Sequence, residues 1–397
     1  MVSTLPPEGG GVSTYTKNLL DSFDLPNAKI TVISRKSKSA AATKSEDFPN
    51  KKINVFPCWT PGFLYPFQIF KALCRYRPKI IHIQHEYFIF GGTLSASLFP
   101  FLLLFTRFLD SKVVVTLHGI VNPSEAKDPE LGINTNGKIG GLLSHIGLLL
   151  VTRLITDNSD RIIVMNNAHK NVLIQQYRCS PKKITLIPHG VPQSQPIDQD
   201  IAKKMLGLNS LKVVLYFGYI TRYKGIDILI KAFKKIEGSK FVLLIGGAPH
   251  PRLKNDPEYL KFWNSVTKEM SEDRRIQFIG FIPDKILSAY ISASDVVVFP
   301  YVASFSTGGP MNITLGHHRP IIASRVSSFS DMLPVDAVFK TGSVPDLYLV
   351  LKRALTDDDF RRELSECTRD IADNRSWKKV AQTTAELYFS LLRKQNS

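Results

Sequence analysis

Cysteine is scarce in this sequence, and no cluster of residues suits a metal ion. The 397 residues include 4 cysteines, and these stand far apart, at Cys58, Cys74, Cys179 and Cys367. No two of them have CxxC spacing and no HExxH motif is present, so the usual zinc-site patterns are missing. We therefore expect free thiols in a reducing compartment, with neither a metal nor a cofactor.

Long apolar runs are missing as well. The most apolar stretch, Leu98–Phe105, is too short to cross a bilayer, and Met1–Gly11 has neither the basic nor the apolar region of a signal peptide. We predict that Phe88–Leu109 forms a helix buried between two strands, with an amphipathic helix facing a membrane as the alternative. These absences favour a cytoplasmic protein.

Acidic residues are too few to balance the basic ones. Lys and Arg total 51 against 34 Asp and Glu, which gives a net charge of +17. Residues 1–190 carry 22 basic and 12 acidic side chains, so most of the excess lies in the first half. A basic surface attracts phosphorylated ligands, anionic lipid or nucleic acid, although a solubility device would give the same balance. No basic and aromatic nucleic-acid motif is visible, so we expect no nucleic-acid partner.

Against these absences stands a regular alternation of strand-like and helix-like segments. Runs such as VVVTL, VVLYF, FVLLI and VVVFP are apolar at successive positions, which is typical of parallel strands buried on both faces. Helix candidates such as Val12–Phe23, Asn167–Tyr177 and Ile226–Ile236 separate them. The alternation predicts an α/β fold with ligands at the carboxyl ends of the strands. The predicted strands are Lys29–Ser34, Ile53–Phe56, Ile80–Gln84, Lys112–His118, Arg161–Asn166, Ile184–Pro188, Leu211–Gly218, Lys240–Gly246, Arg275–Phe281, Asp295–Pro300 and Pro320–Ser324.

The strand series is interrupted once. It stops near Pro188 and resumes at Leu211, with a polar segment between. We therefore expect two α/β domains, residues 1–190 and 191–375, facing each other across a cleft. Residues 376–397 are predicted to form a terminal amphipathic helix.

The segment YFGYITRYKGIDILIKAF holds the most specific pattern. A buried strand ends at Gly218, a loop with Arg222 and Lys224 follows, and Gly225 opens an amphipathic helix. Two cations at the end of a strand, beside a helix N-terminus, suit a phosphate, because backbone N–H groups and the helix dipole also favour negative charge there. We expect the Lys224 side chain to be exposed. Two solvated loop cations are the plain alternative.

A second loop lies between Pro300 and a short helix that begins near Pro310. Its glycines would let a ligand approach the backbone, and hydroxyls such as that of Thr307 can bond sugar or phosphate oxygens. Taken alone, this pattern is common among loops.

In their order along the chain, these segments resemble the donor domain of GT-B glycosyltransferases, and most closely family 4, whose members retain anomeric configuration. The similar segments are FGYITRYKGIDILIKAF, LLIGGAP, IQFIGFIPDKILSAYISASDVVVFP and GGPMNITLGHHRPIIAS. In the first half, PPEGGGVSTYTKNLL, IIHIQHE, VTLHG and IIVMNNAHKNVL follow in the family's order. The resemblance implies a GT-B fold of two Rossmann-like domains. The acceptor would bind the first domain, the donor the second, and the terminal helix would cross back to the first.

The resemblance also implies roles for single residues. Lys224 matches the lysine that binds the donor diphosphate, and Arg222 would replace the family's arginine, whose position holds Tyr219. His118 matches a histidine that contacts the transferred sugar. With Lys224 and Arg222, it forms the expected set of catalytic residues. Backbone groups would bind the nucleobase at residues 281–282, and the first glycine loop would admit the donor phosphate. The expected donor-binding residues are Gly10, Gly11, Gly218, Phe281, Ile282, Thr307, Gly308, Gly309 and Asn312.

One pair of positions departs from the family's pattern. Two glutamates usually stand eight residues apart around the loop that holds the sugar. With Pro310 and Pro320 aligned to the family's prolines, Phe305 and Ile313 occupy those positions. Neither side chain accepts a hydrogen bond, so sugar and ribose contacts are expected from the backbone of residues 308–312 and from Thr307, Asn312 or Thr314.

The remaining polar residues carry weaker signals. His85 and Glu86 stand at the carboxyl end of a strand, where they are candidates for orienting the acceptor, with a structural hydrogen bond as the equal alternative. His189, His317 and His318 stand at turns, where we favour a structural role.

The implied reaction transfers a sugar from a nucleotide-sugar donor to a glycan or lipid-linked acceptor, with retention and without a metal. Lys224, Arg222 and the N–H groups near Gly309 would stabilise the leaving diphosphate. Two alternatives stay open. One is another GT-B enzyme, such as a nucleotide-sugar 2-epimerase, and the other is a non-catalytic basic protein that binds nucleotides or nucleic acid.

Two further expectations concern the first half. Aromatic and basic residues gather over positions 63–77, so we expect peripheral attachment to an anionic surface at the inner face of the cell membrane, unless the aromatics are core residues. These positions are Phe63, Leu64, Phe67, Phe70, Lys71, Arg75 and Arg77. Only Met1–Leu5 precede Pro6, whereas family members begin with a longer strand, so we also expect an in-frame start upstream.

Overall fold

The structure is a computed structural model. It describes residues 1–393 except 9, 26, 38, 40–41, 49–52, 124–137, 251–252, 304–308, 327–328 and 330–331, and the side chains of 138–144 are left out as well. The chain divides into two compact units. The first unit holds Met1–Gly190 and Trp377–Ser397, and the second holds Val191–Ser304 and Gly308–Ser376.

Within the described residues, the first unit is built on a seven-stranded parallel sheet in the order β3-β2-β1-β4-β5-β6-β7. The strand order reverses between β1 and β4, and in such sheets ligands bind beside the strand ends at the reversal. The two-residue β1, too short to show a sequence pattern, nevertheless pairs through Val2 with both Ile33 and Ile83. The strands are β1 (Val2–Ser3), β2 (Ile30–Arg35), β3 (Ile53–Trp59), β4 (Ile80–His85), β5 (Lys112–Leu117), β6 (Arg161–Val164) and β7 (Ile184–Leu186).

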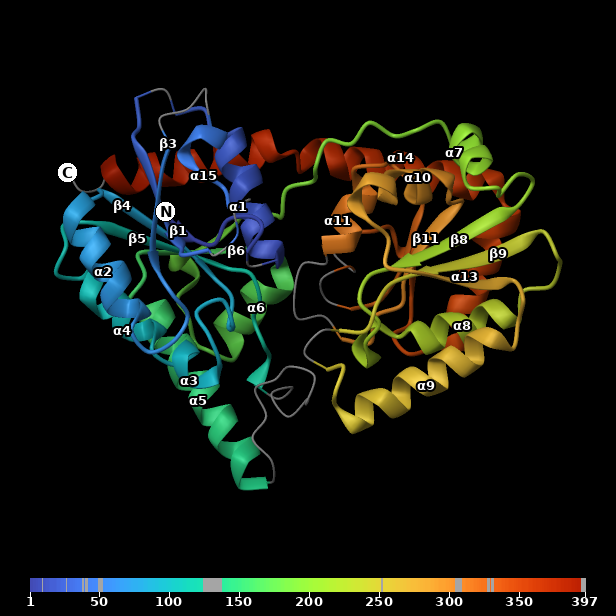
Figure 1. The fold of residues 1–397 in the computed structure, drawn as a ribbon, viewed down its shortest axis with the longest axis horizontal. Coiled ribbons are helices and arrows are strands. Elements are labelled where there is room, and N and C mark those ends of the chain that lie inside the picture. Colours follow the sequence, from blue (N-terminus) through green and yellow to red (C-terminus); the bar gives the residue numbers. More distant parts are fainter. Residues whose placement is uncertain are drawn as a thin grey trace. The chain divides into compact units, whose positions relative to one another are not determined.

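Helices cover both faces of this sheet, with α1 and α15 on one and α2, α4 and α5 on the other (Figure 1). Helix α15 is amphipathic: Val380, Leu387 and Leu391 recur at helical spacing and are buried in the core that α15 shares with α1. The helices of this unit are α1 (Gly10–Ser22), α2 (Tyr65–Tyr76), α3 (Thr93–Ala96), α4 (Phe99–Thr106), α5 (Lys138–Asp157), α6 (Asn167–Gln175) and α15 (Trp377–Arg393).

The predicted buried helix over Phe88–Leu109 is wrong in its burial. The segment forms α3 and α4 between β4 and β5, but only one face of α4 enters the core. Phe101, Leu104 and Phe108, at positions i, i+3 and i+7, are 52%, 36% and 83% exposed. Among the described helices, none combines the length and the apolar character that a membrane crossing requires.

The second unit holds, within its described residues, a six-stranded parallel sheet in the order β10-β9-β8-β11-β12-β13. Its order reverses between β8 and β11. The strands are β8 (Lys212–Phe217), β9 (Phe241–Gly246), β10 (Ile276–Gly280), β11 (Val296–Phe299), β12 (Ile321–Ser324) and β13 (Val338–Phe339). The predicted α/β class, with two Rossmann-like parallel sheets, is confirmed.

Figure 1 shows α8 and α9 on one face of this sheet and α10 and α11 on the other. Strands β9 and β11 are buried along their whole length, as continuous apolar runs predict for a sheet covered on both sides. The helices are α7 (Gln199–Met205), α8 (Ile226–Lys234), α9 (Pro257–Ser271), α10 (Asp284–Ala293), α11 (Gly309–Leu315), α13 (Val344–Thr356) and α14 (Asp358–Asn374).

Candidate functional site

The most specific site residues lie where the strand order of the second unit reverses. Strand β8 is followed by Gly218 and by a single 3-10 turn, Arg222–Lys224, and the neighbouring strand β11 is followed by Pro300 and Tyr301. The backbone N–H of Val302 donates to the carbonyl of Tyr223 at 2.7 Å, so the two loops are tied together. This is the position at which open parallel sheets bind ligands.

Lys224 is buried in this site, with 7% of its surface exposed, so the expectation of an exposed side chain is wrong. Its Nζ lies 5.9 Å and 5.7 Å from the ring centroids of Tyr223 and Tyr301. A Cβ on Gly218 would come within 3.1 Å of the same Nζ. Among the described residues no carboxylate pairs with Lys224, and burial lowers its pKa to about 8.

A second polar group in this loop also has no partner among the residues that the structure describes. Thr221 is buried, and its hydroxyl bonds to none of the described residues. Burying an ammonium or a hydroxyl without a partner costs free energy. An anion that accepts hydrogen bonds and carries negative charge would compensate both groups, so the loop suits a phosphate.

Gly225 closes the loop and holds it against β11. Its backbone is left-handed, with φ of 63°, and a Cβ there would stand 2.1 Å from the carbonyl oxygen of Pro300. Such a contact is far inside van der Waals distance, so only glycine fits. Helix α8 begins at the next residue, Ile226.

Arg222, the second predicted cation, turns to a different element. Its Nη2 donates to the carbonyl of Glu258 at 2.7 Å, and its guanidinium lies 5.2 Å from the ring centroid of Phe262. Both partners belong to α9. The structure therefore brings Lys224, and not Arg222, to the tyrosine rings, and Arg222 remains an exposed residue.

The other donor-side residues fall into three groups. Phe281 is 66% exposed, whereas Ile282 is buried against Gly246, where a Cβ would clash with it at 2.3 Å. Gly309 opens α11, and Asn312 is buried on that helix. Thr307 and Gly308, like Phe305, lie outside the described residues.

The structure describes Thr314, one of the predicted substitutes for the missing glutamates, and Ile313, which occupies one of the glutamate positions. Thr314 is buried and donates its hydroxyl to the carbonyl of Pro310 at 2.9 Å, so it is not available to a sugar. Ile313 packs against the core of the second unit. The apolar residue at the family's glutamate position is thus used for packing.

The predicted residues of the first unit surround its own strand ends. Gly10 has φ of 59°, and a Cβ on either Gly10 or Gly11 would meet nothing within 4 Å, so the backbone there is open to a ligand. His118 follows β5 directly, is buried, and contacts the Tyr15 ring edge-on at 4.7 Å between centroids. Burial, helped by three other histidines, lowers the pKa of His118 well below its usual range.

The two acceptor candidates, His85 and Glu86, differ in burial. His85 is buried, its ring lies 4.4 Å from that of Phe99, and its Nδ1 has no partner among the described residues. Burial lowers its pKa to about 3, so the ring is neutral and belongs to the aromatic core. Glu86 is half-buried. His317 has the structural role predicted for it, because its Nδ1 bonds the carbonyl of Ile313 and its Nε2 the hydroxyl of Ser288.

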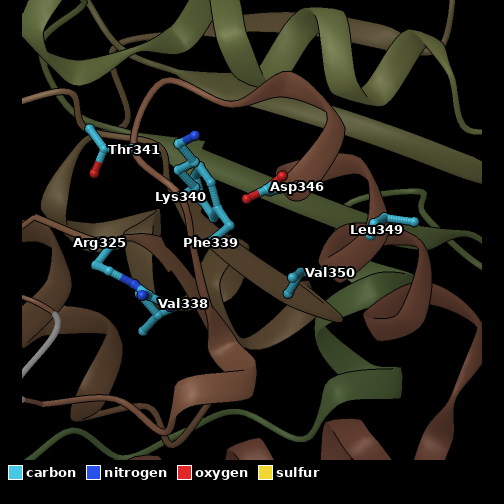
Figure 2. A pocket seen from close by; sticks show the side chains of 8 residues that line it. All are labelled: Arg325, Val338, Phe339, Lys340, Thr341, Asp346, Leu349 and Val350. Carbon is cyan, nitrogen blue, oxygen red and sulfur yellow. The ribbon is translucent and has the colours of Figure 1, made fainter.

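Metal-binding groups and cavities can also mark a ligand site. Within the described part of the chain, no group of three His, Cys, Asp or Glu residues could hold a metal ion. A hollow of about 650 Å³ opens at the ends of β12 and β13, and Figure 2 shows Arg325, Lys340 and Asp346 among its apolar side chains. None of the predicted site residues lines it.

Both halves of the chain match models of glycosyltransferase families. Residues 9–195 match Glycosyltransferase Family 4, and residues 211–357 match Glycosyl transferases group 1. The chain belongs to the GT-B glycosyltransferases of the family 4 type. The resemblance of its motifs to that family is therefore confirmed.

The individual relatives of this chain are distant in sequence. A D-inositol 3-phosphate glycosyltransferase of Corynebacterium kroppenstedtii is 26% identical over 255 residues, which cover 60% of this chain and 55% of that protein. The chain thus spans about half the length of the curated relatives it matches.

Solved structures match over nearly the whole chain. Sucrose-phosphate synthase from Thermosynechococcus elongatus has a TM-score of 0.75 at 18% identity and covers 99% of this chain and 96% of its own. Anabaena HepE in complex with UDP has a TM-score of 0.71 at 16% identity, with 98% and 99% covered. At these identities the similarity establishes the fold alone.

Sequence reasoning missed several residues around the candidate site. Tyr301 follows β11, the strand beside β8, so its place next to a predicted strand end was an available signal. Thr221 and Tyr223 stand in the cationic loop itself. Gln84 and His82 are polar residues at alternate positions of the strand IIHIQH, separated by Ile83. This spacing places both side chains on one face of the sheet.

Proposed function

We propose that the protein transfers a sugar from a nucleotide-sugar donor to a glycan or lipid-linked acceptor, with retention of anomeric configuration. The observation that carries this proposal is the buried Lys224, which has no counter-charge among the described residues and stands at the strand-order reversal of the second unit. Anabaena HepE, which shares the fold, has been solved with UDP and with UDP-glucose. We propose retention because the family 4 enzymes that the chain resembles retain anomeric configuration.

Lys224 supplies what the difficult step needs. Breaking the anomeric C–O bond leaves negative charge on the departing diphosphate, and a fixed ammonium nearby stabilises that charge. Preorganised groups of this kind contribute roughly 3–4 kcal/mol in a site that excludes water. Because the ammonium itself provides the positive charge, we propose that the reaction needs no metal, and that the rate is the same with EDTA and with added Mg²⁺.

A panel of nucleotide sugars tests the proposal. We expect one of the UDP-sugars or GDP-sugars to release its nucleoside diphosphate slowly by hydrolysis and faster when a suitable acceptor is added. Isomerisation of the donor without release of nucleoside diphosphate would instead identify an epimerase. Tighter binding of oligonucleotides than of UDP and GDP at moderate salt would favour the non-catalytic alternative.

We also propose that the protein works in the cytoplasm, attached to the inner face of the cell membrane through the α2–α4 surface. This surface comprises six exposed apolar residues on, or directly beside the ends of, two neighbouring helices: Phe63, Leu64, Phe67, Phe101, Leu104 and Phe108. The helices pack through Phe105, whose ring lies 5.3 Å from that of Phe67 and 5.4 Å from that of Phe70. The alternative, that the aromatics at 63 and 67 are core residues, does not fit their exposure.

Charge supports a lipid surface as the partner. Residues 60–79 carry Lys71, Arg75, Arg77 and Lys79 and no acidic residue, and all four are exposed. Each basic residue near an anionic leaflet contributes about 1 kcal/mol of binding. Apolar side chains beside them would enter the interface between headgroups and acyl chains.

Vesicle co-sedimentation tests the α2–α4 surface. We expect salt-sensitive binding to anionic vesicles, weaker binding to neutral ones, and about a tenfold loss when Phe67 and Phe108 are both replaced by Asp, because two apolar contacts are lost and negative charge is added. The matched control is Phe389→Asp, which changes an exposed phenylalanine of α15. Equal sedimentation with anionic and neutral vesicles at low salt would leave a soluble acceptor as the better proposal.

A further inference from the structure

A chain of buried polar side chains runs through the first unit, and the proposed reaction does not yet account for it. The chain joins His118, Gln84 and His82 to Tyr388 of α15. His82 and Gln84 alternate on β4 and therefore share one face of the sheet, and the register places Thr116 of β5 opposite Gln84. Burying a polar group without a hydrogen-bond partner costs free energy. Each side chain in this network therefore needs its hydrogen bonds to the others.

The hydrogen bonds of this chain all run in the same direction. Gln84 turns its amide oxygen towards His118, whose Nε2–H donates to it at 2.8 Å. The amide nitrogen of Gln84 lies 3.2 Å from Nε2 of His82 and donates to it. The proton of the neutral His82 ring therefore stands on Nδ1, which donates to the hydroxyl of Tyr388. The hydroxyl of Thr116, 2.7 Å from the same Nε2, is a second donor to His82.

This arrangement determines which nitrogen of His118 faces a ligand. A neutral imidazole carries one N–H, and burial keeps both His82 and His118 neutral by lowering the pKa of each ring. With the proton of His118 on Nε2, its Nδ1 is a lone-pair acceptor. That atom bonds to none of the described residues and is not among the fully buried polar atoms.

We propose that Gln84 is a positioning residue that holds His118 in the Nε2–H tautomer, so that Nδ1 of His118 accepts a hydrogen bond from a sugar hydroxyl. Only the identity of the ligand rests on the proposed function, since the tautomer is a property of the free protein. An acceptor nitrogen binds a hydroxyl and disfavours a phosphate or carboxylate, which has no hydrogen to donate. Tyr388 of α15 accepts the last hydrogen bond of this series, so α15 helps to fix the position of His82.

Nitrogen NMR of the histidine-labelled protein tests the tautomer without any activity assay. We expect the Nε2–H form of His118 in the unaltered protein and in Gln84→Glu, whose carboxylate still accepts from Nε2–H. In Gln84→Met, which keeps the volume but offers only a weak sulfur acceptor, we expect both tautomers. Tyr388→Phe should disturb the signals of His82 while the protein stays folded. An Nδ1–H tautomer in the unaltered protein, or no change in Gln84→Met, would overturn the proposal.

Kinetics then test what the tautomer is for. With a donor and acceptor identified, we expect Gln84→Met to lower kcat about tenfold, the effect of one misdirected hydrogen bond, and Gln84→Glu to recover most of it. Affinity for nucleoside diphosphate should not change, because Lys224 belongs to the second unit. The control is Thr106→Val, which removes a buried hydroxyl of the same unit that bonds the carbonyl of Leu103.

The outcomes separate this proposal from the proposed function. If no nucleotide sugar is a substrate, the proposed function fails while the NMR result still decides the tautomer. If the tautomer changes as expected but kcat does not, the role assigned to Nδ1 is wrong. A parallel loss of kcat in Thr106→Val, or a loss of nucleoside-diphosphate affinity in Gln84→Met, would mark a general structural effect and overturn the positioning role.

Discussion

Replacing Lys224 by Met is expected to lower the affinity for nucleoside diphosphate at least tenfold and, at the same time, to make the free protein more stable at pH 7. The loss of affinity follows from the loss of a charge-assisted hydrogen bond to phosphate, which contributes about 1.5–3 kcal/mol. The gain in stability follows from burial. In the free protein Lys224 has no carboxylate partner among the described residues, and its pKa is lowered from 10.5 to about 8.

The stability difference between Lys224→Met and the unaltered protein should shrink as pH rises above 8. Below pH 8 the lysine is charged in both states, so its burial penalty is fully present. Between pH 8 and 10.5 the folded protein loses this proton while the unfolded chain keeps it, so the unaltered protein gains stability relative to the variant as pH rises. A pKa shift of this size corresponds to a penalty on the order of 3 kcal/mol, from which the packing contributed by the lysine stem is subtracted.

Calorimetry with UDP and GDP, and denaturant unfolding at pH 7 and pH 9.5, measure the two effects. The matched control is Lys231→Met on α8, because that lysine is half-exposed and lies 3.8 Å from Asp227 and from Glu269. Lys231→Met should change neither the affinity for nucleoside diphosphate nor the free energy of unfolding by much. Unchanged nucleotide affinity in Lys224→Met would reject the phosphate assignment, and a less stable variant at pH 7 would show that the ammonium is already paired in the free protein.

Gly225→Ala is expected to be the most damaging single substitution in the donor half. The added Cβ would lie 2.1 Å from the carbonyl oxygen of Pro300, in a backbone conformation with φ of 63°. The left-handed conformation alone costs a non-glycine residue roughly 1–2 kcal/mol, and the clash forces the loop away from β11. We expect the free energy of unfolding to fall by about 3 kcal/mol or more, in the range of strained and overpacked sites.

The sequence offers a control for the conformational part of this loss. Gly207 has nearly the same backbone, with φ of 68°, but a Cβ there would meet nothing within 4 Å. Gly207→Ala should therefore show the conformational cost alone and leave nucleotide binding intact. Gly225→Ala should also weaken nucleoside-diphosphate binding more than tenfold, because Lys224 and Thr221 move with the loop. Equal losses of stability in the two variants would mean that the contact with Pro300 is not what requires glycine.

Much of the fold could be predicted because most strands and helices show a pattern of apolar residues within their own sequence. Continuous apolar runs such as FVLLI became strands buried on both faces, since a parallel sheet covered by helices has no polar face. The terminal helix was visible because Val380, Leu387 and Leu391 recur at helical spacing. By contrast, β1 and β13 have two residues each, and their place in a sheet depends on neighbouring strands.

Exposure could not be predicted equally well. The run Leu98–Phe105 is apolar at every position, yet the neighbouring elements cover only one face of α4. Phe101 and Leu104 remain exposed, and so does Phe108 just beyond the helix. Apolar sequence shows that a segment can be buried. Whether it is buried depends on how much neighbouring surface the rest of the chain supplies.

The sequence by itself determined the two-domain α/β class, the family, and the loop in which Lys224 and Gly225 stand, because each of these depends on residues that are neighbours in the chain. Only the tertiary structure decided the environment of those residues. Lys224 is buried because Tyr301, from the end of a different strand, comes beside it, while Arg222 is drawn to α9. His118 meets Gln84 because β4 and β5 pair in one register. Charge state, tautomer and access are set by groups distant in sequence, since burial and hydrogen bonding depend on what lies within a few ångströms in space.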